Sequence, residues 1–441
     1  MGTVLFVIAI LFELAFAVYC IVKKQDHQRL RNGLRVAALL AFVILVFPSV
    51  IVWSFRWILI TVLLFTFAGI GAFSLIRNKA SKHEFKTSRI VVKAVIMTLL
   101  LILALAPALV FPQHKLPKVT GPYGIATAKY TYVDNNRIEE FADNGKNRSV
   151  NVQFWYPEDT DGTYPLLVFS HGASGIKTSN ASTFRELASH GYVVCSIDHP
   201  YHSFFTVSDD GSVTLMNSDY NREVTDANKD GIYTVEQVNG LIQKWMKLRT
   251  DDINFVIDTV LDKSQAQTDE DLVYQLVDKE KIGVFGHSMG GAASVAIGRE
   301  REDVDAVVNL DAPFFSELVY DRESGDFKAS GEAYTTPILN LYSDDVWNQL
   351  GSSSAYAANY TADKTFKEAY TVHFQGAKHL SLTDLPLASP LLANMLQGGK
   401  ATIDPYYCIE TENDLIVKFF DYTLKDAGRF ESEETYGPRP N

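Results

Sequence analysis

The sequence has little cysteine, and the cysteines it has do not suit a metal site. Three cysteines occur among 441 residues, and no Cys/His spacing of the kind that binds zinc is present. Cys20 falls in a long apolar run, Cys195 in a short apolar segment, and Cys408 near the C-terminal end. We therefore favour buried free thiols over a disulfide between Cys195 and Cys408. No metal ion or other cofactor follows from this pattern.

Basic residues are scarce in most of the chain. Residues 1–111 hold 12 basic and 3 acidic residues, a net charge of +9, whereas the rest holds 28 basic and 49 acidic residues, a net charge of −21. An acidic surface repels phosphate groups, which excludes nucleic acid as a partner. The same repulsion argues against tight binding of the acidic part to anionic lipid.

The chain also lacks the basic start that a cleaved signal peptide needs. Instead, four apolar runs of 18 to 20 residues crowd its first quarter. Each run is long enough to cross a bilayer as a helix. We therefore predict that 1–111 is the four-span transmembrane region of an integral, multi-pass membrane protein, with the lipid bilayer as a partner. The predicted spans are 3–22, 36–53, 57–76 and 94–111.

Basic residues mark the loops between these runs unevenly. Five lie in the first loop and six in the third, but the second has only Arg56. Because cytoplasmic loops concentrate Lys and Arg, we expect the N-terminus and everything after residue 111 on the extracytoplasmic side. Glu13 lies within the first run. An intramembrane carboxylate is a functional candidate, although a protonated or hydrogen-bonded structural glutamate is the simpler explanation.

After the spans the pattern changes. We interpret 112–149 as a linker leading into a domain, because 112–125 are rich in Pro and Gly. From 150 to 430, short apolar runs alternate with helical patterns, which predicts an α/β fold with a mostly parallel sheet covered by helices. A short tail, 431–441, follows. Expected strands are 151–155, 166–169, 192–197, 281–285, 304–310, 338–342 and 370–374, and expected helices are 182–189, 249–261, 292–297 and 415–424.

Residues 203–247 have the features of a cap-like insertion that covers a pocket and sets specificity. Within it, Asp226, Asn228 and Asp230 match the first half of a calcium loop. Position twelve of such a loop is normally Glu, but Gln237 stands there. We therefore favour an ordinary Asp/Asn-rich turn over a Ca²⁺ site.

The segment VFGHSMGG, residues 284–291, supplies a candidate nucleophile. An apolar strand leads into the pentapeptide GHSMG, and a helix of small residues leaves it. This is the setting of a nucleophile elbow, whose sharp turn favours glycine on both sides of the serine. We predict Ser288 as the nucleophile, with the backbone N–H of Met289 pointing at a developing oxyanion.

Such a serine needs a histidine base and an acid that orients it, in the chain order Ser, acid, His. His373 alternates within a predicted strand, whereas His379 lies in the loop after it, so we choose His379 as the base. Two acid positions compete. Asp311 ends one predicted strand, and Asp344 and Asp345 end the next. Both strand ends lie at the functional edge of the sheet, so both positions remain open.

A second oxyanion donor is expected from the loop after the strand at 166–169. That loop reads SHGASG, and Gly172 lets its backbone approach a substrate closely. We predict the backbone N–H of Ala173 as this donor. His171 precedes the serine in the chain and is interpreted as structural.

Five segments occur in the order SHGASG, LASHGYVVCSIDH, RTDDINFVIDTVL, GHSMGG and NLDAPFF. They resemble the α/β-hydrolases of the platelet-activating factor acetylhydrolase group, and two of them are also similar to cutinase-like polyester hydrolases and dienelactone hydrolases. The resemblance covers about 150–425 and implies an α/β-hydrolase fold and serine esterase chemistry without a cofactor. In the acetylhydrolase group the acid follows the sixth strand, which maps onto Asp311. Cutinase-like enzymes place it after the seventh, near Asp344 or Asp345.

Together these features predict a membrane-anchored, extracytoplasmic serine hydrolase with the triad Ser288, His379 and Asp311. Its expected substrates are small-molecule or lipid esters, with short acyl chains. An acyltransferase or a peptidase with the same triad stays open as an alternative. So does a catalytically degenerate membrane sensor or scaffold. In a further alternative the spans themselves are functional, as a transport or lipid-handling unit that uses Glu13.

Overall fold

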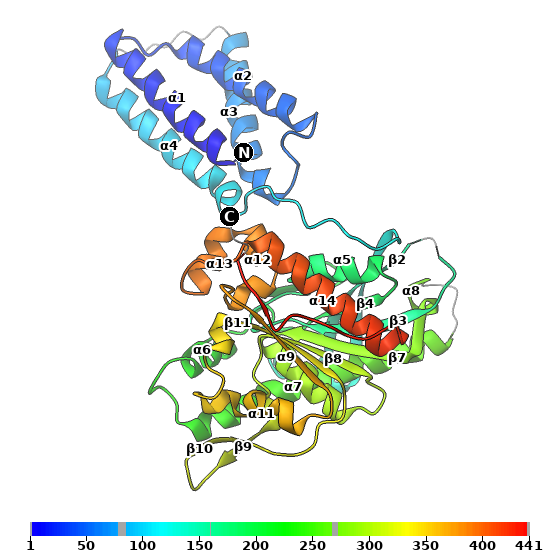
Figure 1. Cartoon of the computed structure of the whole chain (residues 1–441). Coiled ribbons are helices and arrows are strands. Elements are labelled where there is room, and N and C mark those ends of the chain that lie inside the picture. The colour runs from blue at the N-terminus through cyan, green and yellow to red at the C-terminus, as the bar shows by residue number, and fades with distance from the viewer. Residues whose placement is uncertain (1, 78–84, 159, 267–271, 439–441) are drawn as a thin grey trace. The chain divides into compact units, whose positions relative to one another are not determined.

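The computed structural model describes residues 2–77, 85–158, 160–266 and 272–438. Lys79 and Lys82, two basic residues of the third loop, lie outside these ranges. The chain divides into two compact units, a helical one and one built on a sheet (Figure 1). The first comprises 1–115 with 387–392, and the second comprises 116–386 with 393–441. All three cysteines are buried and free, as predicted for Cys195 and Cys408.

Four helices make up most of the first unit. Among the described residues, three segments are long and apolar enough to cross a membrane: Gly2–Val22, Phe55–Ile76 and Thr87–Val110. The helices are α1 (Gly2–Val22), α2 (Gln28–Val46), α3 (Ile58–Ile76, preceded by the 3-10 turn η1, Phe55–Trp57) and α4 (Thr87–Val110).

The prediction of a fourth span, at 36–53, is wrong. The helix there, α2, begins at Gln28 and ends at Val46. It therefore takes in three arginines and leaves out the apolar residues next to Pro48, a residue that stops a helix. Only its second half is free of charge. Those eleven or so residues rise about 16 Å as a helix, well short of the roughly 30 Å hydrocarbon core.

A nine-stranded sheet forms the centre of the second unit. Its strand order is β1-β2-β4-β3-β7-β8-β11-β12-β13. β2 is antiparallel to both neighbours, and every pair from β4 to β13 is parallel. The predicted fold class, a mostly parallel sheet with helices preceded by a helical region, is confirmed. The strands are β1 (Ile125–Ile138), β2 (Asn147–Pro157), β3 (Tyr164–Ser170), β4 (Val193–Asp198), β7 (Val277–His287), β8 (Ala306–Leu310), β11 (Ile338–Ser343), β12 (Ala369–Phe374) and β13 (Thr435–Tyr436).

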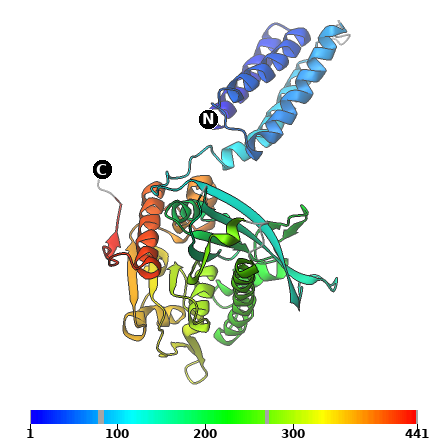
Figure 2. The same ribbon diagram turned by 90° about the vertical axis from the view of Figure 1, so that its right-hand side faces the viewer.

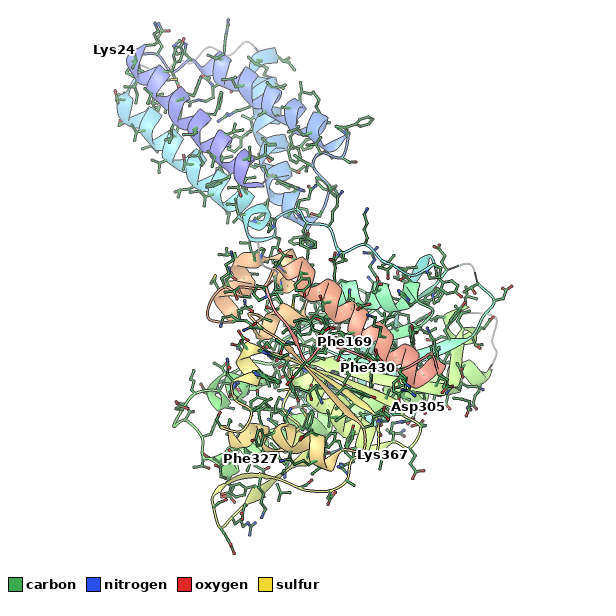
Figure 3. The ribbon with its side chains drawn as sticks, in the orientation of Figure 1. Lys24, Phe169, Asp305, Phe327, Lys367 and Phe430 are labelled. Atoms are coloured by element: carbon green, nitrogen blue, oxygen red, sulfur yellow. The ribbon has the colours of Figure 1, made fainter. Side chains whose placement is uncertain are left out.

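Helices cover both faces of this sheet (Figure 1, Figure 2). Along β3, Val168 belongs to one apolar core and its neighbour Phe169 to the other. This alternation is expected of a strand buried on both faces. Figure 3 labels Phe169 and Phe430, which share the second core. The first core includes α7 (Val235–Ala266) and α9 (Met289–Glu300), and the second includes α5 (Ala181–Ser189) and α14 (Pro405–Lys425).

The other elements are short and lie outside the central sheet. The hairpins are β5 (Phe205–Val207) with β6 (Val213–Leu215), and β9 (Leu318–Asp321) with β10 (Asp326–Ala329). The helices are α6 (Ser218–Ala227), α8 (Leu272–Gln275), α10 (Asp344–Trp347), α11 (Ala357–Thr365), α12 (Leu385–Ala388), α13 (Pro390–Leu396), η2 (Phe315–Glu317), η3 (Ser354–Tyr356) and η4 (His379–Leu382).

Every expected strand and helix of the second unit has a counterpart, but several begin earlier than expected, and one strand, β1, was not expected. The Thr, Tyr and Lys residues of β1 give no apolar run, and most of its side chains are exposed or half-exposed. α7 begins at Val235 rather than near 249, and its residues before Ile242 are exposed or half-exposed, so they give a weaker apolar signal. The segment 203–247 therefore consists of the β5–β6 hairpin, α6 and the start of α7.

Candidate active site

Ser288 lies in the turn between β7 and α9 and is partly exposed. Its φ of 54° and ψ of −126° form a conformation that residues other than glycine rarely adopt. The Ser288 N–H donates to the Leu310 carbonyl at 2.8 Å, which ties the turn to β8. Met289 is the first residue of α9, so its N–H has no acceptor within the helix.

Two glycines make this turn sterically feasible. A Cβ on Gly290 would overlap the carbonyl oxygen of Ser170 at the end of β3. A Cβ on Gly286 would overlap the backbone of Gly290. Gly290 is therefore required by the packing of the turn against β3, and Gly286 by the close approach of the backbone within the turn.

His379 and Asp311 come together although 68 residues separate them. The Nδ1–H of His379 donates to Oδ2 of Asp311 at 2.7 Å. Asp311 is buried, and it also accepts from the N–H and the hydroxyl of Ser343 at 2.7 Å each. Burial by itself lowers the pKa of His379, but the hydrogen bond and charge of Asp311 outweigh it. The pKa of His379 is therefore raised above its ordinary value.

The competing acids have other partners. Oδ1 of Asp344 lies 2.8 Å from Nε2 of His373, and its Oδ2 accepts from a backbone N–H at 2.9 Å. Asp345 accepts from the backbone N–H of His379 at 2.9 Å, not from the ring. The structure thus brings the His379 ring to Asp311 and places Asp344 beside His373.

A second histidine supports the loop that carries His379. The Nε2–H of His287 donates to the His379 carbonyl at 2.9 Å, and the two ring centroids are 4.6 Å apart. Burial lowers the pKa of His287 to about 3, so this ring stays neutral. The contact of His287 with this loop could not be predicted, because His287 is a variable position of the motif and nothing in the sequence links it to a residue 92 positions away.

The loop after β3 lies beside Ser288. A Cβ on Gly172 would come within 3.0 Å of Nδ1 of His287 and 3.1 Å of Cβ of Ser288. Glycine therefore permits a closer approach than any other residue would.

The Gly172 carbonyl in that loop is held by three donors. It accepts from Nδ1 of His171 at 2.7 Å, from the Gly175 N–H at 3.1 Å and from the Arg249 guanidinium at 3.3 Å. The peptide that follows is trans, so the N–H of Ala173 points away from that carbonyl. Fixing the carbonyl therefore fixes the direction of the Ala173 N–H.

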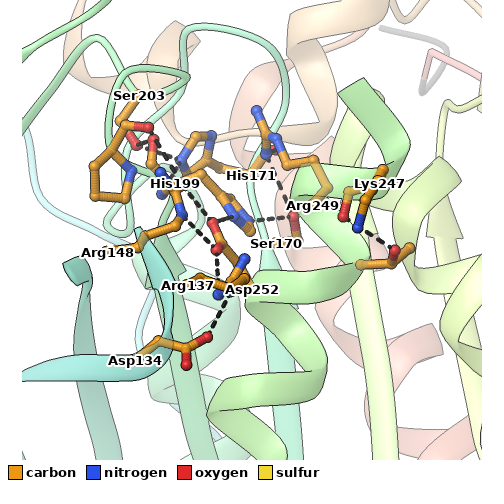
Figure 4. A network of polar contacts seen from close by, with 12 residues as sticks. Asp134, Arg137, Arg148, Ser170, His171, His199, Ser203, Lys247, Arg249 and Asp252 are labelled. Atoms are coloured by element: carbon orange, nitrogen blue, oxygen red, sulfur yellow. Dashed lines mark hydrogen bonds and ion pairs between the residues drawn. The ribbon is translucent and has the colours of Figure 1, made fainter. Parts of the chain in front are cut away.

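Arg249, which sequence analysis did not single out, is completely buried on α7. Its Nη1 donates to the His171 carbonyl at 2.6 Å, so its planar fork holds two consecutive carbonyls of the loop. Figure 4 shows it beside Ser170 and His171. Arg249 lies four residues before Ile253 and so falls on the apolar face of the helix. A cation on that face could have marked Arg249 as a buried residue with a structural role.

Asp252, one turn along α7, anchors a second layer of polar contacts (Figure 4). Arg148 binds both of its carboxylate oxygens at 2.7 Å, and Nδ1 of His199 lies 3.0 Å away. The other nitrogen of His199 lies 2.9 Å from the hydroxyl of Ser170. Burial opposes ionisation of Asp252, but Arg148 outweighs it and holds the pKa of Asp252 well below its ordinary value. The loop after β3 therefore rests on a rigid, charged base.

Part of the segment 203–247 contacts Met289 and Ser174, the residue after Ala173. The Tyr220 hydroxyl donates to the sulfur of Met289 at 3.3 Å. The hydroxyl of Ser174, which follows Ala173, donates to the sulfur of Met216 at 3.0 Å. This segment therefore forms part of the surroundings of Ser288.

Within the described part of the chain, no group of three or more His, Cys, Asp or Glu side chains is placed to hold a metal ion. Asp226 lies in the last turn of α6 and pairs with Lys229 at 2.8 Å. Asn228 caps the same helix. Asp226 and Asn228 thus belong to the C-terminal end of a helix.

Residues 149–434, more than half of the chain, match the family model described as platelet-activating factor acetylhydrolase, isoform II. The chain is similar to the platelet-activating factor acetylhydrolase of Canis lupus familiaris, with 29% identity over 300 residues covering 63% of this chain and 61% of that one. It is also similar to that of Bos taurus, with 23% identity over 289 residues covering 62% and 61%. The chain thus spans about three-fifths of the length of these relatives.

Among solved structures, the ferulic acid esterase from Streptomyces cinnamoneus is similar, with a TM-score of 0.55 and 20% identity. The match covers 73% of this chain and 96% of that one. At this identity the likeness concerns the fold alone, and it confirms the α/β-hydrolase fold predicted from the sequence.

Proposed function

The chain belongs to the platelet-activating factor acetylhydrolase isoform II family, and on this premise we propose that it is a membrane-anchored serine hydrolase of carboxylic esters. The observation that carries the proposal is the 2.7 Å hydrogen bond from His379 to the buried Asp311. Ser288 lies in a strained turn, and the residue before it, His287, contacts His379. We therefore propose His379 as the oriented base that the Ser288 hydroxyl needs.

The reaction proceeds in two halves. The hydroxyl oxygen of Ser288 attacks the ester carbonyl carbon while Nε2 of His379 accepts the hydroxyl proton. The tetrahedral intermediate then collapses, and the leaving alkoxide takes that proton from His379 and departs as an alcohol. Water attacks the acyl-enzyme by the same route and releases the acid. Asp311 stays ionised throughout and stabilises the imidazolium.

The developing negative charge on the carbonyl oxygen needs two donors. We assign the N–H groups of Met289 and Ala173. The first lies at the N-terminus of α9, where it has no helical acceptor. The second belongs to the peptide whose carbonyl Arg249 holds, so Arg249 acts as a positioning residue. A cation on that carbonyl also polarises the peptide and strengthens its N–H as a donor.

The substrate class follows from the family and from the surroundings of the site. Two relatives bear the name of an enzyme that removes an acetyl group. We therefore propose short acyl esters, including esters carried by a lipid. Tyr220 contacts Met289, and Met216 contacts Ser174, the residue after Ala173. These contacts support the proposal that the segment 203–247 limits the acyl chain.

The helical unit supports membrane anchoring. Three of its segments, 21 to 24 residues long, are apolar enough to span a bilayer. The extracytoplasmic orientation expected from the sequence depended on four crossings. With three crossings, the basic loops 23–54 and 77–86 would face opposite sides of the bilayer, so we propose membrane anchoring without assigning a side to the hydrolase. We also propose the domain boundaries given by the sequence, with membrane region 1–111 and hydrolase 150–430.

A panel of p-nitrophenyl esters tests the function. The full chain in detergent is incubated with the acetate, butyrate and octanoate, beside Ser288→Ala. We expect hydrolysis of the acetate and butyrate to exceed that of the octanoate, and to vanish in the variant. A folded full chain without activity on any of the three would contradict the esterase assignment.

A further inference from the structure

The four N-terminal helices surround a cavity of about 430 Å³. All four contribute to its lining, for example Leu5 of α1, Leu45 of α2, Leu63 of α3 and Leu105 of α4. This volume lies within the roughly 300 to 1,000 Å³ of sites that hold small molecules. Three alanines of α2 line it, and their small side chains leave the space open. They are Ala37, Ala38 and Ala41.

Charge is confined to one end of this cavity. Of its 22 lining residues only Glu13, Arg31 and Arg35 are charged. Consecutive helices run in opposite directions (Figure 1), so these three residues lie toward the end formed by the α1–α2 turn, which contains Lys24 (Figure 3). Ten residues separate Arg35 from Leu45 along α2, a rise of about 15 Å. The cavity is therefore elongated, polar at one end and apolar at the other.

The charged end carries an excess of positive charge. Asp26 lies 3.6 Å from Arg31, but its other oxygen is held by Lys93 at 2.7 Å. The negative groups at this end are Glu13 and Asp26. The positive groups are Arg31, Arg35 and Lys93. Among the residues that the structure describes, one cation at the mouth of the apolar space is thus left without a counter-charge.

Both arginines lie over aromatic rings, and Arg31 also has an unused donor. Arg31 is only 8% exposed, and its guanidinium lies 5.1 Å from the ring centre of Phe16. Its buried Nε–H has no hydrogen-bond partner within the described chain. Arg35 lies 4.6 Å from the ring centre of Phe67. A buried cation with an unused donor is costly unless an anion completes the site.

We propose that this cavity binds a single-chain lipid anion. Its carboxylate or phosphate head would accept hydrogen bonds from Arg31 and Arg35, whose planar forks suit two-oxygen anions. Its hydrocarbon tail would run along α2 toward Trp57, which lines the opposite end. A fatty acid and a lysophospholipid share this chemistry. The four helices would then be a lipid-binding unit as well as an anchor, whether or not Ser288 is catalytic.

Quenching of Trp57 by a brominated lipid tests the proposal. The full chain, carrying Ser288→Ala to exclude hydrolysis, is held in an uncharged detergent and titrated with a dibrominated C16 fatty acid. Trp57 is only 1% exposed and lies at the tail end of the cavity. We expect saturable quenching that is lost in Trp57→Phe, and no saturable quenching by the methyl ester of the same acid. Equal quenching by the acid and its methyl ester would overturn the proposal, because the cavity would then bind hydrocarbon chains without recognising the anionic head.

Two variants separate the charged end from the apolar space. Arg35→Gln removes one fork and is expected to raise the Kd about tenfold or more, because a charge-assisted hydrogen bond is lost. Ala38→Phe fills the cavity and should abolish saturable quenching. The matched control is Arg77→Gln, whose guanidinium lies over Phe73 at 4.2 Å and does not line the cavity. Its Kd should not change. Unaltered binding in folded Arg35→Gln and Ala38→Phe would overturn the proposal.

Competition against the brominated acid identifies the head group. An unbrominated fatty acid and a single-chain lysophosphatidic acid are added in separate titrations. Stronger displacement by the fatty acid assigns a carboxylate ligand, and stronger displacement by the lysolipid assigns a phosphate ligand. Failure of both to displace the probe would contradict a specific anion site.

Discussion

The ring of His379 reaches Asp311 at 2.7 Å and leaves Asp344, which is much nearer in the chain, to pair with His373. This relationship predicts which acid serves the triad. Asp311→Asn should lower kcat/KM by about 10² to 10⁴, because the base loses its orienting carboxylate. Asp344→Asn should change it by no more than a few-fold. Steady-state kinetics on p-nitrophenyl acetate check this, and the reverse ranking would transfer the role to Asp344.

The pH dependence of the reaction should reflect the raised pKa of His379. A general base works only when unprotonated, so the rate falls as pH drops through that pKa. Because Asp311 raises the pKa of His379, the acid limb of kcat/KM should have its midpoint above the ordinary histidine value of about 6.5. His287 should not contribute, since its pKa is about 3. A midpoint at or below 6.5 would argue against His379 as the base.

Arg249 should act on the rate rather than on substrate binding. Arg249→Lys keeps the charge but loses the fork that holds two carbonyls, so the Ala173 N–H is no longer fixed. We expect kcat to fall about ten- to a hundredfold with KM little changed. The rate of inactivation by an organophosphate should fall in parallel. The control is Arg299→Lys, whose fork binds Glu317 away from the site. Unchanged kcat in folded Arg249→Lys would remove the positioning role.

The close approach of the loop after β3 can be tested by adding one methyl group. Gly172→Ala would push that loop from Ser288, because the new Cβ meets Nδ1 of His287 and Cβ of Ser288 near 3 Å. We expect kcat/KM to fall about tenfold or more. Gly240→Ala is the matched control, since that position on α7 is open. It should stabilise the helix by roughly 0.5–1 kcal/mol and leave the rate unchanged. Equal rates in both variants would refute the close approach.

Much of the fold could be predicted because parallel strands buried on both faces leave a clear signal. The runs around Val168 and Val284 are short, apolar and bounded by turn residues. β1 left no such signal, since its alternating Thr and Tyr residues need only one buried face at the sheet edge. The span at 36–53 was predicted wrongly for a related reason. An apolar run does not show where its helix starts, and α2 extends back through Arg35 and Arg31.

The candidate site was predictable to the extent that chain order constrains it. Ser288 and His379 follow from the elbow and from the loop after a strand. The acid could not be chosen from the residues alone, because Asp311 and Asp344 both end parallel strands at the same sheet edge. Side-chain direction separates them, and it depends on contacts that sequence spacing does not encode. Arg249 was overlooked for the opposite reason, since a charge within a helix is usually solvated.

Covalent labelling directly tests whether Ser288 is the catalytic nucleophile. The full chain and Ser288→Ala are treated with diethyl p-nitrophenyl phosphate, and the released p-nitrophenol is counted before the peptides are analysed by mass spectrometry. We expect one equivalent released per chain, a diethyl phosphate adduct on Ser288, loss of esterase activity in step with labelling, and no release from the variant. A folded chain that releases none, or an adduct on another residue with activity lost, would contradict it.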